Sequence, residues 1–197
     1  MTTEEIKQSI ASWTSTRENA KVLNKKFQQG NSFSYDVPPY ADASSYLHVY
    51  PGLFDGQLLF FVIPAEYDNE QYAEEIDKYT IVCPAENGLS GGHNITPTEA
   101  NARILAWEEH HVAWIQQKVN TVDGVFQAFE IATEDFEAAS VVITLGLKKT
   151  PKAELDFNAD MIVTNKINTQ LVYDDFSRPI PPFSSTADVQ SFYLLSV

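Results

Sequence analysis

Cysteine and basic residues are scarce in this sequence of 197 residues. Its single cysteine, Cys83, has no second thiol in the chain with which to form a disulfide, so we expect a reducing compartment, the cytoplasm. Only 13 Lys and Arg residues stand against 27 Asp and Glu residues, and the formal net charge is −14. Because nucleic acids and anionic membranes are bound through Lys and Arg, we expect this chain to bind neither.

Long hydrophobic runs are also missing. The longest apolar run, residues 58–63, is far shorter than the roughly 20 residues that cross a bilayer. Residues 1–5 show no basic stretch followed by an apolar core, so no secretory signal is expected. We therefore predict no insertion into a membrane.

Aromatic residues, in contrast, are plentiful, with 12 Phe, 9 Tyr and 3 Trp, and 44% of all residues are hydrophobic. This composition supplies enough apolar surface for a packed core, and the length favours a single domain, 1–197. The acidic charge is concentrated, since residues 31–147 contain 18 Asp and Glu but only 3 Lys and Arg. Such a region serves either solubility or the binding of a basic partner.

Helical periodicity is clearest at the start and in the middle of the chain. Segment 1–30 repeats apolar residues every three or four positions, and the capping patterns Thr2-x-x-Glu5 and Ser15-x-x-Glu18 predict two helices within it. A second helical region, 96–119, opens on Thr-Pro-Thr-Glu, which is typical of a capped helix with proline in its first turn.

Strands are predicted on both sides of this long helix. Residues 46–50 and 57–63 are rich in β-branched and aromatic residues and indicate a hairpin. After residue 124 the apolar period changes from 3.6 to 2, which predicts an antiparallel meander over 124–175. The strands expected in the meander are 125–131, 141–147, 157–163 and 169–173.

Helices and strands in separate blocks predict an α+β fold. In this fold the N-terminal helices and one long amphipathic helix pack on a mainly antiparallel sheet. We divide the single domain into a helical segment, 1–30, a part with hairpin, strand and long helix, 46–119, and the meander, 124–175.

Two motifs imitate functional sites without completing them. The stretch 88–92, GLSGG, matches the nucleophile elbow around Ser90, but it lacks a strand directly before it and a helix directly after it. The elbow also needs a histidine well after the serine, whereas the last histidine, His111, already lies in the next predicted helix. The stretch 156–160, DFNAD, opens like a calcium-binding loop, but Met161 stands where that loop needs glycine. We expect a surface loop and the polar face of a strand, and we predict neither a metal nor a cofactor.

The long helix carries the most informative side chains. A rotation of about 100° per residue places apolar residues on one arc: Ala100, Ile104, Trp107, Trp114 and Ile115. His111 falls near the centre of this arc, and Glu108 falls at its edge, three residues away. The pair is interpreted either as a hydrogen-bonded core histidine beside the tryptophans or as an acid/base pair in a pocket.

A second candidate lies on the predicted hairpin, where Tyr46, His48 and Tyr50 share one face of a strand. Such a row suits either packing or the wall of a ligand pocket. Cys83 lies in an apolar strand and is interpreted as a buried, inert thiol.

These observations favour a non-catalytic binding or protein-interaction domain, and they leave its partner open between a basic protein and a small molecule. The alternative is a small-molecule-binding protein or an enzyme with a pocket at the Glu108/His111 face, so whether the chain is an enzyme stays open. The ligand-binding residues predicted for that alternative are Trp107, Glu108, His111, Trp114 and His48.

Overall fold

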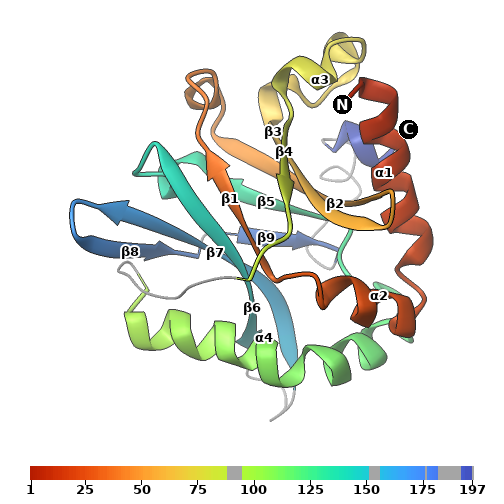
Figure 1. Ribbon diagram of the computed structural model, residues 1–197, viewed down its shortest axis with the longest axis vertical. Helices are drawn as coiled ribbons and strands as arrows, with labels where there is room; N and C mark the ends of the chain where they lie inside the picture. Colours follow the sequence, from red (N-terminus) through yellow and green to blue (C-terminus); the bar gives the residue numbers. More distant parts are fainter. Residues whose placement is uncertain (88–94, 151–155, 176, 182–191, 197) are drawn as a thin grey trace.

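Two antiparallel sheets and four α-helices make up the part of the chain that the computed structural model describes, residues 1–87, 95–150, 156–175, 177–181 and 192–196 (Figure 1). The predicted α+β class is confirmed. The helices are α1 (Thr3–Thr16), α2 (Ala20–Phe27), α3 (Ile76–Tyr79) and α4 (Pro97–Lys118), and short 3₁₀ turns include η2 (Ala65–Tyr67), η3 (Glu70–Tyr72) and η5 (Tyr193–Leu195). In this part of the chain no helix is long and apolar enough to cross a membrane.

The strands form a four-stranded and a five-stranded sheet. The four-stranded sheet has the order β1-β6-β7-β8, and its strands are β1 (Ser32–Asp36), β6 (Ser140–Lys149), β7 (Phe157–Ile167) and β8 (Gln170–Asp174). The five-stranded sheet has the order β4-β3-β2-β5-β9, and its strands are β4 (Ile81–Pro84), β3 (Gln57–Pro64), β2 (Tyr46–Phe54), β5 (Ala128–Ala132) and β9 (Ser177–Ile180).

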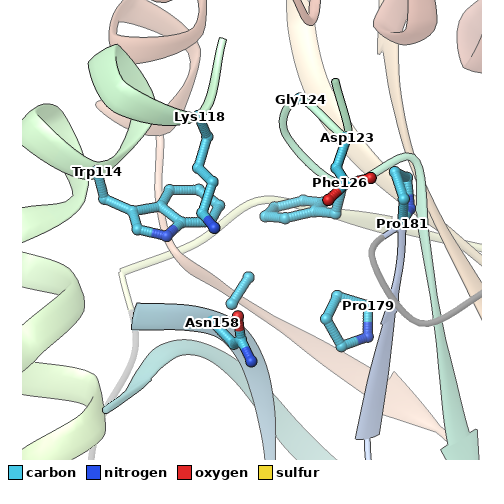
Figure 2. Close-up of a pocket in the computed structure, with 9 residues that line it drawn as sticks. Trp114, Lys118, Asp123, Gly124, Phe126, Asn158, Pro179 and Pro181 are labelled. Carbon is cyan, nitrogen blue, oxygen red and sulfur yellow. The ribbon is translucent and has the colours of Figure 1, made fainter. Parts of the chain in front are cut away.

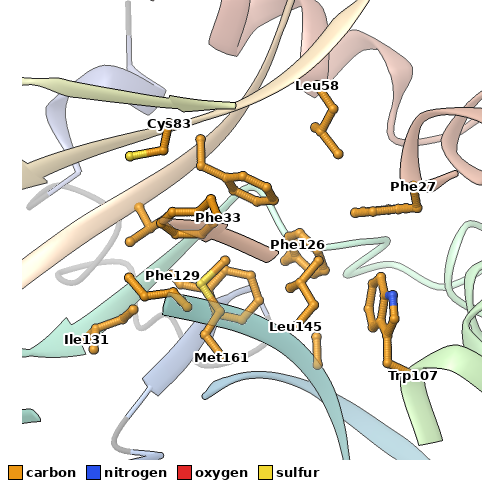
Figure 3. Close-up of a cluster of buried hydrophobic side chains, with 14 of the residues drawn as sticks. Phe27, Phe33, Leu58, Cys83, Trp107, Phe126, Phe129, Ile131, Leu145 and Met161 are labelled. Atoms are coloured by element: carbon orange, nitrogen blue, oxygen red, sulfur yellow. The ribbon is translucent and has the colours of Figure 1, made fainter. Parts of the chain in front are cut away.

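The largest buried cluster lies between the two sheets (Figure 3). The rings of Phe33 on β1 and Phe60 on β3 stack at 4.5 Å, so the inner faces of the sheets meet directly. Trp107 and Trp114 of α4 join the same cluster, and Trp114 Nε1 donates to the Phe157 carbonyl at 2.9 Å. Apolar burial on this scale is the main stabilising contribution to such a fold.

Each outer sheet face is covered by a helix. Ile6 and Ile10 of α1 belong to a second buried cluster on the five-stranded sheet, and Ala100 and Ile104 of α4 belong to a third on the four-stranded sheet. A Cβ at Gly52 would lie 2.3 Å from the Phe61 ring and 3.1 Å from the backbone of α1, so α1 can approach β2 this closely only over glycine.

The long helix and the hairpin agree with the sequence prediction. Thr96 caps α4 by accepting from the Glu99 amide at 3.1 Å, and the five apolar residues of the predicted arc are all buried. The hairpin forms from β2 and β3, but β2 extends to Phe54 and the connection shrinks to a tight turn at Asp55 and Gly56.

One of the two helix caps predicted in the N-terminal segment is confirmed. Thr2 and Glu5 form the predicted capping box. The second predicted cap is wrong, because α1 continues to Thr16 and Asn19 caps α2 instead. The Ser15 hydroxyl donates to the Ser12 carbonyl at 2.9 Å and is therefore used inside the helix.

The predicted meander is confirmed for β6, β7 and β8, but β5 does not belong to it. Instead, β5 pairs with β2 and β9 in the other sheet. All five residues of β5 are buried, so the strand shows no alternation that would tie it to one neighbour. Strand β1 lies between the predicted helical segment, 1–30, and the predicted hairpin, where the sequence analysis assigns no strand, and it pairs along the edge of β6.

Candidate functional site

His48 lies in a buried polar cluster, which we define as His48, Tyr50 and Asp68. Nδ1 of His48 is 2.6 Å from Oδ2 of Asp68, and the Tyr50 hydroxyl donates to the same oxygen. Since a carboxylate only accepts, Nδ1 of His48 is the donor. The exposed fractions are 1% for His48, 0% for Tyr50 and 2% for Asp68, so the cluster is closed to solvent.

The C-terminal segment covers this cluster. The Phe192 ring stacks on the His48 imidazole at 3.9 Å, and the Leu194 amide donates to Oδ1 of Asp68 at 3.3 Å. Burial, together with the charge and hydrogen bond of Asp68, raises the pKa of Tyr50 well above its ordinary value. The packing interpretation of the Tyr46-His48-Tyr50 row thus fits His48 and Tyr50, while Tyr46 is 38% exposed.

A charged row crosses the five-stranded sheet beside the cluster. Glu130 on β5 lies directly opposite His48 in the strand register, and Arg178 on β9 lies opposite Glu130. Arg178 donates to Oε1 of Glu130 from Nε at 3.0 Å and from Nη2 at 2.5 Å. The row therefore runs from a partly exposed guanidinium to a buried imidazole.

The predicted residues on α4 are only partly brought together. Trp107 and Trp114 are buried, but His111 is half-buried and Glu108 is exposed. Nδ1 of His111 donates to the Trp107 carbonyl at 2.8 Å, and the His111 ring stacks on Trp107 at 5.5 Å. Both Glu108 and His111 lie in the described part of the chain, and no hydrogen bond or ion pair joins them.

A small recess opens next to the C-terminal half of α4 (Figure 2). The Trp114 and Phe126 rings face it, Asn158 and Pro179 border it from two strands, and Lys118 reaches over its mouth. Its empty space is about 270 Å³, and fully inside it there is room for about one water molecule. Ligand sites usually enclose about 300–1,000 Å³ and bury most of the ligand, so this recess suits at most a small group. Of the predicted site residues, Trp114 lines it.

The densest charged cluster ties α4 to the four-stranded sheet. Nη1 of Arg103 is 2.7 Å from Oδ2 of Asp160, and Arg103 also donates to Asp175 and Glu99. Burial raises the pKa of Asp160 although Arg103 and Ser177 donate to it. The pKa of Asp175 is lowered, because hydrogen bonds from Arg103 and Lys148 outweigh its partial burial. Asp175 is thus the carboxylate whose ionised form this cluster favours.

A half-exposed aromatic cluster lies at the opposite side of the molecule from α4. It consists of Tyr40, Tyr67, Tyr72 and Tyr79, which we call the tyrosine cluster. The Tyr67 and Tyr79 rings stack in parallel at 3.9 Å, and Tyr40 and Tyr72 each meet both rings edge-on at 5.1–6.0 Å. Burial, together with the neighbouring phenols of Tyr67 and Tyr79, raises the pKa of Tyr40 above its ordinary value.

Acidic side chains flank the tyrosine cluster. Residues 64–80 contain six Asp or Glu and one basic residue, Lys78, which pairs with Glu75 at 3.2 Å. Glu66, Glu70, Glu74 and Asp77 are exposed, whereas Asp68 belongs to the buried polar cluster. The polar composition of residues 66–77 is also compatible with one short helix, but the structure has η2, η3 and α3. The recurrence of tyrosine within an acidic stretch is the signal that sequence reasoning missed.

The remaining motifs add no further site. Ser90 and the rest of the 88–92 stretch lie outside the described residues. Asp160 faces α4 from the middle of β7, so the 156–160 stretch is the polar side of a strand. Cys83 is 2% exposed, and burial raises the pKa of its thiol to about 12. In the described part of the chain, no three His, Cys, Asp or Glu side chains are grouped to hold a metal ion.

No protein-family model matches this chain, and comparisons with curated proteins and with solved structures give no match either.

Proposed function

We propose that this protein is a non-catalytic binding domain of the cytoplasm that takes a basic segment of a partner protein on the tyrosine cluster. The observation that supports the proposal is the packing of four half-exposed tyrosine rings, three of which come from the acidic stretch 64–80. Tyrosine rings present a large contact area at a small cost in conformational entropy, and they are enriched in protein interfaces.

The chemistry of the surface favours a cationic ligand. An Arg or Lys side chain over an aromatic ring gains roughly 0.5–2 kcal/mol, and several adjacent rings offer more than one such position. The exposed carboxylates of Glu66, Glu70 and Glu74 add long-range attraction, which raises the association rate of a basic partner and weakens as salt is added. A buried, inert Cys83 suits a reducing compartment such as the cytoplasm.

The test uses a labelled peptide in which Arg alternates with Gly, and a matched peptide with Glu in place of Arg. Fluorescence anisotropy should show binding of the Arg peptide only, and Tyr72→Ala should weaken it about fivefold, since one lost cation–π contact is worth about 1 kcal/mol. Tyr46→Ala, at an exposed tyrosine outside the cluster, is the aromatic control, and Glu108→Gln on α4 is the charge control. Absence of Arg-peptide binding, or equal weakening by Tyr72→Ala and Tyr46→Ala, would refute the proposal.

A further inference from the structure

The C-terminal segment 192–196 packs tightly on the end of the molecule that carries the tyrosine cluster. Phe192 is 0% exposed and Leu194 is 1% exposed, and both belong to the buried cluster under α1. The Tyr193 ring lies 5.3 Å from Nζ of Lys7 on α1. Figure 1 shows this segment beside the N-terminal end of α1 and near the turns around α3. We call residues 192–196 the strap.

Asp68 joins the strap to the tyrosine-bearing segment. One carboxylate oxygen accepts from His48 and Tyr50 on β2, and the other accepts from the Leu194 amide of the strap. Asp68 directly follows Tyr67, and its own amide closes the η2 turn on the Ala65 carbonyl at 3.2 Å. A fixed Asp68 therefore fixes the backbone that presents Tyr67.

Apart from Asp68, this segment is held by its half-exposed tyrosine rings and by the Glu66 amide, which donates to Ser44 Oγ at 3.3 Å. Among residues 65–75, all of which the structure describes, Asp68 is the only buried residue. The segment consists of short turns, and its hydrogen bonds include local ones such as that from Asn69 Nδ2 to the Glu66 carbonyl at 2.7 Å. A surface segment of this kind opens easily unless a buried side chain anchors it.

Anchoring by a buried carboxylate depends on its donors. A carboxylate removed from water is tolerated only where hydrogen bonds replace its hydration, and here one of the three donors comes from the strap. Phe192 additionally covers the His48 ring and excludes water from the cluster. Loss of the strap would remove a donor from Asp68 and admit water to it.

We infer that the strap is a positioning element for the tyrosine cluster, and that it acts through Asp68. With the strap in place, residues 65–72 hold one conformation and the rings of Tyr67 and Tyr72 stay assembled with Tyr79. With the strap weakened, the segment samples open conformations, and affinity for a basic ligand falls with the population of the assembled surface. This last step rests on the proposed function, whereas the ordering of residues 65–72 does not.

Two matched variants of the full chain test the inference. Phe192→Leu removes the ring over His48, and Phe129→Leu removes an equally buried ring from the core between the sheets. Hydrogen–deuterium exchange of peptides from residues 65–79 should accelerate about tenfold in Phe192→Leu and should change little in Phe129→Leu. Asp68→Asn, which leaves the strap side chains intact, should reproduce the effect of Phe192→Leu on residues 65–79.

Binding of the Arg peptide supplies the second readout. Its Kd should rise about fivefold in Phe192→Leu and stay near the wild-type value in Phe129→Leu. Unchanged exchange of residues 65–79 in Phe192→Leu would overturn the inference, and so would accelerated exchange with unaltered affinity. If the exchange responds as expected but wild-type protein binds no Arg peptide, the proposed function fails while the strap keeps its ordering role.

Discussion

Replacement of Arg103 by Met should destabilise the fold strongly, because Arg103 is the hub of the charged cluster between α4 and the four-stranded sheet. Its side chain is 7% exposed and donates to Asp160, Asp175 and Glu99. Methionine keeps the apolar stem and removes only the guanidinium. The carboxylate of Asp160, which is 4% exposed, is then left with Ser177 Oγ at 2.8 Å as its donor.

The magnitude follows from the burial of each partner. Breaking a buried ion pair on one side typically costs about 3–5 kcal/mol, because the remaining charge is stranded. The Glu99 carboxylate is 52% exposed and regains water, and Asp175 keeps Lys148 at 3.1 Å, so these two contribute little. We expect a loss of about 3 kcal/mol, a large part of the roughly 5–15 kcal/mol that stabilises a domain.

Urea unfolding, followed by tryptophan fluorescence, measures this loss. Trp107 and Trp114 lie on the same helix as Arg103 and report its detachment. The double variant Arg103→Met with Asp160→Asn should recover at least half of the lost stability, because no charge is then stranded. Either of two results would refute the reasoning. One is an unfolding free energy of Arg103→Met within about 1 kcal/mol of the wild-type value, and the other is a double variant whose loss equals the sum of the losses of the two single variants.

Two further predictions concern single ionisable side chains. His111→Ala removes the hydrogen bond to the Trp107 carbonyl and should lower the unfolding free energy by about 1 kcal/mol and Tm by about 2–4 °C. His110→Ala, the control, should have less than half this effect. Equal melting temperatures of the two variants in calorimetry would contradict a stabilising role of His111. Asp175→Asn should destabilise the protein at pH 7. The difference in urea midpoint between wild type and Asp175→Asn should shrink as the pH falls below 3.8, the ordinary pKa of the carboxyl, because the pKa of Asp175 in the folded protein is lower still. A difference that grew on acidification would show that Arg103 does not favour the ionised form.

Local features of this protein follow from the sequence alone. The capped start of α4 and its buried arc are encoded by neighbours within a few residues, because helix geometry repeats every 3.6 residues. The alternation in β6 likewise places Val141, Ile143 and Leu145 toward the core. Such periodicities depend on the backbone alone and need no knowledge of the partner strand.

Which strands pair with one another depends on the tertiary structure. Strand β5 is buried on both faces, so no pattern in its five residues distinguishes a place beside β2 from a place in the meander. The partial exposure of His111 has a related cause. Its angle on the helix points toward the core, but Trp107 and Trp114 fill the interior and leave His111 half-buried on the Trp107 ring.

The acidic, tyrosine-rich character of residues 64–80 can be read from the sequence, but the buried polar cluster and the tyrosine cluster cannot. His48 meets Asp68 across 20 residues and Leu194 meets Asp68 across 126, and the four tyrosine rings come together from separate turns. Only the fold brings these groups to one place, because a buried carboxylate must find donors wherever the packed chain supplies them.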